Sequence, residues 1–156
     1  MIQKTNAIRI LEKENILHSV HSYEVDESDL SGITVAKKIH AEPESVFKTL
    51  VTHGDKNGIN VFCIPVTEEL NLKKAASVSD NKRIEMIKEK ELFNLTGYVK
   101  GGCSPIGMKK KYPAYIDETA ELFDEIYVSA GVRGMQVKLS LDDLKKITGS
   151  KTADLL

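Results

Sequence analysis

VFKTLVTHGDKNGINVFCIPV, residues 46–66, has the pattern of a β-hairpin. Residues 46–53 alternate as a strand does, and residues 59–66 form the returning strand. The turn between them contains Asn57-Gly58, the strongest local signal for a hairpin. Because hairpin strands pair antiparallel, this segment predicts antiparallel pairing within a sheet.

Outward from the hairpin, helical and strand patterns alternate along the chain. Helices are predicted from the cap Thr5 to about Asn15, over 34–40, 70–76 and 89–95, as a short turn or helical piece after Pro43, and from the capping box of Ser140 and Asp143 to Ile147. Strands are predicted over 18–25, 82–86, 114–116, 126–130 and 135–139. No internal repeat or long linker interrupts the pattern. The sequence therefore predicts one mixed α/β domain over residues 1–156.

Composition excludes several classes of protein. The chain has 156 residues, 41% of them hydrophobic, and a net charge of −1. A protein that holds long stretches of nucleic acid is usually strongly basic. If this chain acts on a nucleic acid, it should therefore hold only the tip of that nucleic acid or depend on a partner protein for affinity. No apolar run approaches the roughly 20 residues of a membrane span. Residues 1–6 lack the apolar stretch of a signal peptide, which predicts a cytoplasmic protein.

Cysteine and histidine usage predicts no metal site. Cys63 and Cys103 are far apart and form no CxxC pair, which excludes a disulfide framework and a Cys-rich zinc site. His18 and His21 are three residues apart, and on a strand that spacing places them on opposite faces. No cluster of carboxylates or cysteines completes a metal site with them.

Lys48 is the first candidate functional residue. On a strand it shares a face with Val46 and Leu50, and the opposite face is also apolar, which predicts a central strand. An unpaired buried ammonium costs several kcal/mol (order of magnitude), so Lys48 must reach a partner or a cleft. The alternative is a lysine at the sheet edge that extends its ammonium to solvent.

Residues 97–107, GYVKGGCSPIG, are the second candidate. Consecutive glycines let the backbone approach a ligand and direct N–H groups at a phosphate, a ribose hydroxyl or a developing oxyanion. The segment lacks the GK[ST] ending of a Walker A loop, and it follows a predicted helix, unlike a Rossmann fingerprint. The alternative is a structural loop, but its density of special residues favours function.

Two further features flank these candidates. Ser129-Ala130-Gly131 ends a strand before Arg133-Gly134, and this second glycine turn either completes a pocket or simply closes a hairpin. Residues 109–111 are three lysines directly after the glycine-rich segment. Such a run is either a solvated face or a set of phosphate contacts beside a pocket.

Taken together, these motifs resemble the YbaK/EbsC family, relatives of the editing domain inserted in bacterial prolyl-tRNA synthetases. The resemblance covers nearly the whole chain. It is carried by the 7–23 stretch, VFKTL at 46–50, LKK at 72–74, Gly97-Tyr98, GGCSPIG at 101–107, IYVSAG at 126–131 and Arg133-Gly134. The lysine motif together with the GGxSPxG segment is a specific combination.

The resemblance implies a fold, an activity and a site. The fold would be a curved, barrel-like mixed sheet surrounded by helices, of the editing-domain type. The activity would be removal of cysteine from proline tRNA, with Cys-tRNA(Cys) as an alternative further substrate, in partnership with prolyl-tRNA synthetase and without a cofactor or metal. Lys48 would hold the terminal nucleotide or the aminoacyl ester. The expected substrate-binding residues are Tyr23, Gly32, Thr49, Gly97, Gly101, Gly102, Cys103, Ser104, Pro105, Gly107, Ser129 and Gly131.

The implied chemistry needs no nucleophile–base pair. The family is thought to let the substrate's own thiol attack its ester carbonyl, so the protein contributes positioning and electrostatic help. One alternative is a deacylase for alanine or another small amino acid, in which water attacks. A second alternative is a non-catalytic regulatory module, against which the retention of Lys48 and the whole glycine-rich segment argues.

Two positions depart from the family pattern. Gln136 stands where some relatives carry an acidic residue near the pocket, which bears on recognition of the substrate's amino group. Cys103 stands at the variable position of GGxSP, where other members carry an aliphatic residue. A cysteine there is either a nucleophile or a small residue of the pocket wall, and no neighbouring base is evident to activate it.

Overall fold

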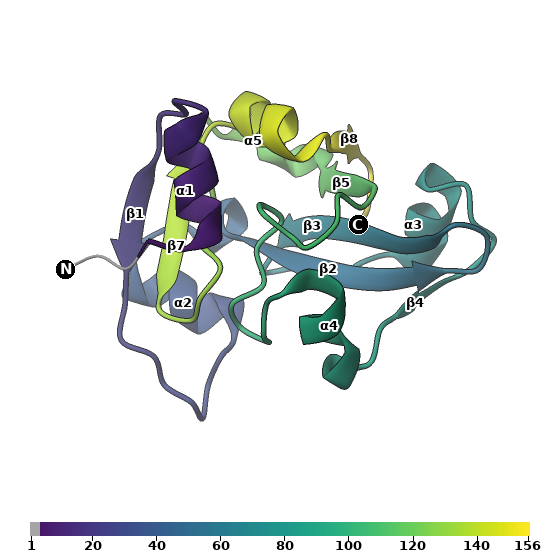
Figure 1. The fold of residues 1–156 in the computed structure, drawn as a ribbon, viewed down its shortest axis with the longest axis horizontal. Helices are drawn as coiled ribbons and strands as arrows, with labels where there is room; N and C mark the ends of the chain where they lie inside the picture. Colours follow the sequence, from purple (N-terminus) through teal and green to yellow (C-terminus); the bar gives the residue numbers. More distant parts are fainter. Residues whose placement is uncertain (1–3) are drawn as a thin grey trace.

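A computed structural model describes residues 4–156, and Figure 1 shows the arrangement of their helices and strands. The helices are α1 (Asn6–Lys13), α2 (Gly32–Lys38), α3 (Leu72–Val78), α4 (Leu92–Thr96) and α5 (Leu141–Thr148), with 3₁₀ helices at Pro43–Ser45, Glu89–Glu91 and Glu118–Leu122. The strands are β1 (Ser19–Ser22), β2 (Phe47–Gly54), β3 (Gly58–Pro65), β4 (Ile84–Met86), β5 (Ala114–Asp117), β6 (Ile126–Ser129), β7 (Met135–Leu139) and β8 (Lys151–Ala153). Residues 1–3, half of the segment considered for a signal peptide, lie outside the described residues.

The described strands form two sheets. The smaller has the order β1-β7-β6 and is antiparallel, and the larger has the order β4-β2-β3-β5-β8. In the larger sheet, the predicted hairpin pairs β2 with β3 antiparallel from Phe47–Pro65 to Gly54–Gly58, whereas β3–β5 and β5–β8 are parallel. A parallel bridge between Val46 and Tyr127 connects the two sheets. The strands thus form the mixed sheet arrangement that the sequence predicts.

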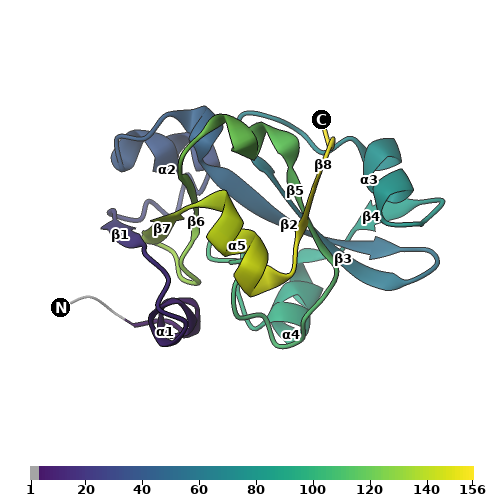
Figure 2. The same ribbon diagram turned by 90° about the horizontal axis from the view of Figure 1, so that it is seen from above.

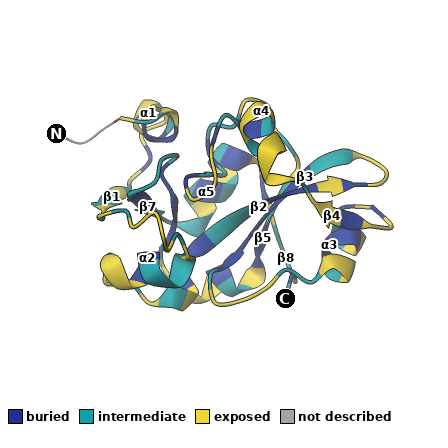
Figure 3. Ribbon diagram, turned by 90° about the horizontal axis from the view of Figure 1, so that it is seen from below, coloured by how far each residue is buried: buried dark blue, intermediate teal, exposed yellow. Residues whose placement is uncertain are grey.

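Helices cover the sheets and complete the core. The largest cluster of buried residues joins Leu11 of α1, Val128 of β6, Val137 of β7 and Leu144 of α5. Figure 2 shows α5 lying between the smaller sheet and the β5–β8 pair, and Figure 3 shows the buried residues gathered on the strands, with exposed residues on the outward side of α1. No helix in residues 4–156 has the length and apolar character that crossing a membrane requires.

Local signals determine several helix ends. The Thr5 hydroxyl accepts a hydrogen bond from the Ile8 N–H, and the Ser140 hydroxyl accepts one from the Asp143 N–H, as their capping patterns predict. Gly97 follows α4 with φ +86°, the left-handed conformation that glycine adopts at a helix C-terminus. These helix ends were accessible to sequence reasoning because they depend on neighbouring residues alone.

Other elements differ from the prediction. The strand expected over 18–25 is limited to Ser19–Ser22, because its partner β7 begins only at Met135, after the glycine turn. The helix expected over 89–95 begins as a 3₁₀ helix and becomes α-helical at Leu92. Strand β8 was not predicted, since three residues carry almost no alternation, and it exists through its parallel pairing with β5.

Candidate active site

A cavity of about 260 Å³ lies where the start of β2, the N-terminus of α2 and the glycine-rich loop meet. Six of the residues expected at the site line it, namely Gly32, Lys48, Thr49, Gly101, Cys103 and Ser129. Lys48 therefore lies in the same cavity as the loop, although 53 positions separate it from Gly101. The rest of the wall is mostly apolar and includes Leu30, Val35, Val46 and Val66.

The cavity adjoins a free edge of β2. The Val66 N–H donates to the Val46 carbonyl on the β3 side, whereas the Ile87 N–H donates to the Val51 carbonyl on the opposite side. Because backbone groups of successive residues point to alternate edges of a strand, those of Thr49 face the same edge as Val51. Strand β4 pairs only with Thr52–Gly54. Thr49 lines the cavity, and its N–H and C=O have no strand partner on this edge among the described residues.

The structure confirms the predicted central position of β2, between β4 and β3 in the larger sheet, and shows how the two ends of the strand differ. The prediction holds at its C-terminal end, where β3 and β4 pair on both sides of Thr52–Gly54. Lys48 pairs with Ile64 of β3, and the nearest pairing on the other edge is the bridge of Val46 with Tyr127, so the lysine stands beside an unpaired stretch of that edge and lines the cavity. Its side chain is partly buried, and the five ion pairs found in residues 4–156 do not include it. The ammonium is therefore available to an anionic or carbonyl ligand.

Gln136 contributes a buried hydrogen-bond acceptor to the cavity wall. It lies on β7 opposite Ser129 of β6, and only 6% of its surface is exposed. Its Oε1 has no hydrogen-bond partner within residues 4–156. Asn60 has the other such buried oxygen, but it does not line the cavity. A buried acceptor without a donor costs free energy, about 1–3 kcal/mol, that a ligand N–H would recover.

The cavity contains no general base. None of its lining residues is a histidine, an aspartate or a glutamate. Burial raises the pKa of the Cys103 thiol to about 12, so the thiol stays protonated at neutral pH. Because the thiolate is the nucleophilic form, Cys103 behaves here as a small wall residue. The arrangement can position and polarise a bound ester but offers no activated protein nucleophile.

Several residues expected at the pocket act instead as supports of the loop. A Cβ at Gly102 would lie 3.0–3.1 Å from the backbone of Val132 and Arg133, so this glycine permits close packing of the loop on the β6–β7 turn. Gly131, with φ +100°, faces the Tyr98 ring, where a Cβ would lie 2.9 Å from a ring carbon. The Tyr98 hydroxyl donates to the Ile106 carbonyl. Together these contacts hold the two glycine turns against each other.

Others among the expected pocket residues are not in its wall. Ser104 is fully buried, and its hydroxyl accepts a hydrogen bond from the Ile106 N–H. Tyr23 packs on the cluster of buried residues that contains Tyr127. Gly97 ends α4. Within residues 101–107, only Gly101 and Cys103 line the cavity of Lys48, whereas Ser104 and Ile106 are fully buried.

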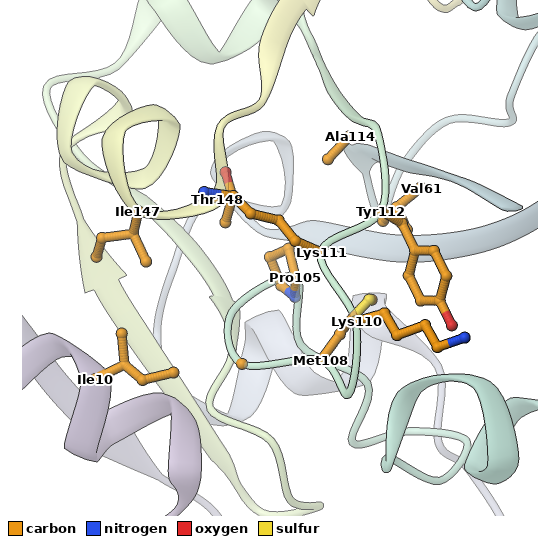
Figure 4. Close-up of a pocket in the computed structure, with 11 residues that line it drawn as sticks. Ile10, Val61, Pro105, Met108, Lys110, Lys111, Tyr112, Ala114, Ile147 and Thr148 are labelled. Carbon is orange, nitrogen blue, oxygen red and sulfur yellow. The ribbon is translucent and has the colours of Figure 1, made fainter.

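Pro105 and Gly107 line a different cavity, of about 170 Å³. Figure 4 shows this cavity between α1, α5 and residues 105–112, with the Lys111 side chain reaching across to Thr148 at the end of α5. It contains neither Lys48 nor the free edge of Thr49. The two cavities thus lie on different sides of the glycine-rich loop, and only the first combines a cation, free backbone groups and an orphaned buried acceptor.

Apart from Gln136, six wall residues were not among the expected site residues. Val46, Phe47 and Lys100 lie within segments that the sequence singles out, whereas Leu30, Val35 and Val66 carry no motif of their own. The extent of the pairing between β4 and β2 also could not be read from residues 82–86 alone.

The histidines make local contacts. The His18 Nδ1 bonds to the Ile16 carbonyl, and the His21 Nε2 bonds to the Ser19 hydroxyl. Burial lowers the pKa of His21, whose ring also packs edge-on against Tyr127. Within residues 4–156, no group of three or more His, Cys, Asp and Glu side chains is placed to hold a metal ion.

Known proteins resemble this chain in sequence and in fold. Residues 31–147 match the family model of the "Aminoacyl-tRNA editing domain". The chain is 44% identical to the "Putative Cys-tRNA(Pro)/Cys-tRNA(Cys) deacylase EbsC" of Enterococcus faecalis over 98% of this chain and 93% of that protein. A crystal structure described as "a putative trans-editing enzyme for prolyl tRNA synthetase" has a TM-score of 0.82 at 26% identity, covering 99% of this chain and 98% of that one. A hypothetical protein of known structure, 18% identical, shares the fold with a TM-score of 0.87 over 97% and 99% of the two chains.

Replacing Gly32 tests how tightly α2 closes the cavity. A Cβ at Gly32 would lie 2.2 Å from Cγ1 of Val66. We expect Gly32→Ala to lower the free energy of unfolding by about 1–3 kcal/mol through overpacking. The double variant Gly32→Ala/Val66→Ala should lose less than the sum of the two single variants in urea titrations. If the losses of unfolding free energy in the two single variants added up in the double variant, the expected clash between a Cβ at position 32 and Val66 would be contradicted.

Alkylation tests the protonated state of Cys103. The pKa of its thiol is raised from 9.0 to about 12, so its thiolate fraction near pH 8 falls about 1000-fold. We expect native protein to react with iodoacetamide far more slowly than protein unfolded in urea, with label at Cys103 located by peptide mass analysis. Fast labelling of native Cys103 at pH 7 would restore the nucleophile alternative.

Proposed function

The chain belongs to the aminoacyl-tRNA editing domain family, and on that premise we propose that this editing deacylase removes cysteine attached by mistake to proline tRNA. The observation that carries the proposal is the cavity in which Lys48, the free edge of Thr49 and Gly101 converge without a general base. The relative that is 44% identical over 98% of this chain is described as a putative Cys-tRNA(Pro)/Cys-tRNA(Cys) deacylase, which supports the choice of cysteine. The function would be exercised in the cytoplasm, where tRNAs are charged.

The proposed reaction uses the substrate's thiol as nucleophile. The cysteine sulfur forms a bond to the ester carbonyl carbon, the bond from that carbon to the ribose oxygen breaks, and the thiol proton ends on the released ribose hydroxyl. The products are a four-membered thiolactone and free tRNA. Such a path needs positioning, which can supply several kcal/mol (order of magnitude), rather than an activated side chain. It also excludes amino acids that lack a thiol.

The residues of the cavity have distinct proposed roles. The Lys48 ammonium binds the terminal phosphate or the ester carbonyl. The free N–H of Thr49 and the amide of Gly101 stabilise the developing oxyanion, as preorganised donors do. The orphaned Oε1 of Gln136 accepts a hydrogen bond from the substrate's α-ammonium, and its neutral amide replaces the acidic residue of some relatives. Cys103 and Ser129 fill the wall.

The proposed editing unit is the whole chain, residues 1–156. The family model begins at residue 31, but Ala7 and Leu11 of α1 are fully buried in the largest core cluster. Removing α1 would expose that core. The N-terminal segment is therefore counted with the editing domain.

The direct test of the function is hydrolysis of defined substrates. We expect the protein to consume Cys-tRNA(Pro) at least tenfold faster than Ala-tRNA(Pro), with thiolactone detectable by mass spectrometry. Lys48→Ala should lower kcat/KM by about 100-fold, whereas Lys56→Ala, in the exposed hairpin turn, should not. Equal rates on the two substrates would favour the alternative in which water attacks alanyl esters.

Partnership with prolyl-tRNA synthetase is part of the same proposal. A net charge of −1 leaves little electrostatic affinity for the body of a tRNA, so specificity for proline tRNA would come from the synthetase. Adding the synthetase to the assay should raise kcat/KM for Cys-tRNA(Pro) and leave free cysteinyl-adenosine unaffected. Identical rates with and without synthetase, together with no complex in a pull-down, would remove this partner.

Gln136 offers a separate test of substrate recognition. Gln136→Leu removes the orphaned oxygen, so its thermal stability should equal or exceed that of the parent protein. Its kcat/KM should nevertheless fall about 10- to 100-fold, since a hydrogen bond to a charged group is lost. Gln136→Glu, which keeps an acceptor, should retain most of the turnover. Full activity of Gln136→Leu would contradict the assignment.

A further inference from the structure

Exposed apolar side chains gather beside the mouth of the substrate cavity. Six large hydrophobic residues of the described chain are exposed, and three of them, Met86, Phe93 and Val99, border two neighbouring hollows. Phe93 of α4 is the only aromatic among the six and is 55% exposed. Nothing in the proposed chemistry at Lys48 uses these side chains.

The two hollows continue outward from the substrate cavity. The nearer one, of about 370 Å³, shares Thr49, Lys100, Gly101 and Cys103 with it. The farther one, of about 300 Å³, shares Glu89, Leu92 and Lys100 with the nearer one. We name the two hollows together the outer groove. An RNA strand whose 3′ end lies at Lys48 and whose preceding nucleotides pass Lys100 and Gly101 would enter the outer groove.

Cations flank the exposed aromatic ring of the outer groove. The Lys109 Nζ lies 5.0 Å from the centroid of the Phe93 ring. Lys90 and Arg133 line the farther hollow. Glu89 is also present, but it pairs with Lys100 at 3.3 Å, and Arg133 pairs with Glu27 at 2.8 Å. The ion pairs of residues 4–156 leave Lys90 and Lys109 without an acidic partner.

We propose that the outer groove binds the unpaired nucleotides next to the terminal nucleotide of the substrate tRNA, with Phe93 stacking on a base. This inference rests on the proposed function. Single-strand binding surfaces combine an aromatic platform with cations that follow the phosphates, and the outer groove has both. Its continuity with the cavity favours this occupant over a protein, because an RNA strand ending at Lys48 has to cross the adjoining surface.

Substrates of different length test the proposal. With aminoacylated RNA that carries an unpaired 3′ end, Phe93→Ala should raise KM about tenfold. With cysteinyl-adenosine, which is too short to reach the outer groove, KM should change less than twofold. Phe93→Trp should restore KM for the longer substrate. Leu122→Ala, which removes another exposed apolar side chain, is the matched control and should behave as the parent protein.

Charge gives a second, independent measurement. Lys109→Ala should weaken binding of a non-aminoacylated oligonucleotide with the same 3′ end and make the affinity less dependent on salt. This binding assay needs no deacylation, so it still reports on the outer groove if the proposed reaction is wrong. Unchanged oligonucleotide affinity in both Phe93→Ala and Lys109→Ala would overturn the proposal. So would an equal rise in KM for both substrates, or a Phe93 effect confined to assays that contain synthetase.

Discussion

The site depends on the point at which β4 stops pairing with β2. Between the hydrogen bond from the Ile87 N–H to the Val51 carbonyl and the bridge of Val46 with Tyr127, no strand pairs with this edge of β2 within residues 4–156. That interval leaves the backbone of Thr49 free and lets α2 and the glycine-rich loop close over it. A longer β4 would satisfy the same backbone groups and remove the cavity. The length of the edge strand β4 thus determines whether this part of β2 is paired within the sheet or borders a binding site.

Around this edge, the protein supplies groups that need no activation. The Lys48 ammonium carries a charge, the amides of Thr49 and Gly101 are fixed by the fold, and Gln136 presents a buried oxygen that lacks a donor. Cys103 is held as a thiol by burial. This set matches a reaction in which the substrate brings its own nucleophile, because only positioning and electrostatic stabilisation are left for the protein to provide.

Sequence reasoning was most successful where neighbours in the chain determine the structure. The hairpin of residues 46–66 and the caps at Thr5 and Ser140 follow from local patterns and agree with the structure. The motif around Lys48, together with the glycine-rich loop, identified the family. It could not separate glycines that line the cavity, such as Gly101, from those that permit packing, such as Gly102, because both needs select the same residue. The open edge at Thr49 and the exposure of Phe93 depend on contacts distant in sequence.

The most direct measurement is a crystal structure with a non-hydrolysable cysteinyl-adenosine analogue. The account predicts the carbonyl of the aminoacyl group within hydrogen-bond distance of the Lys48 ammonium or the Thr49 N–H, and its amino group at Oε1 of Gln136. An analogue bound instead in the cavity of Pro105 and Lys111, with the Lys48 cavity empty, would contradict it.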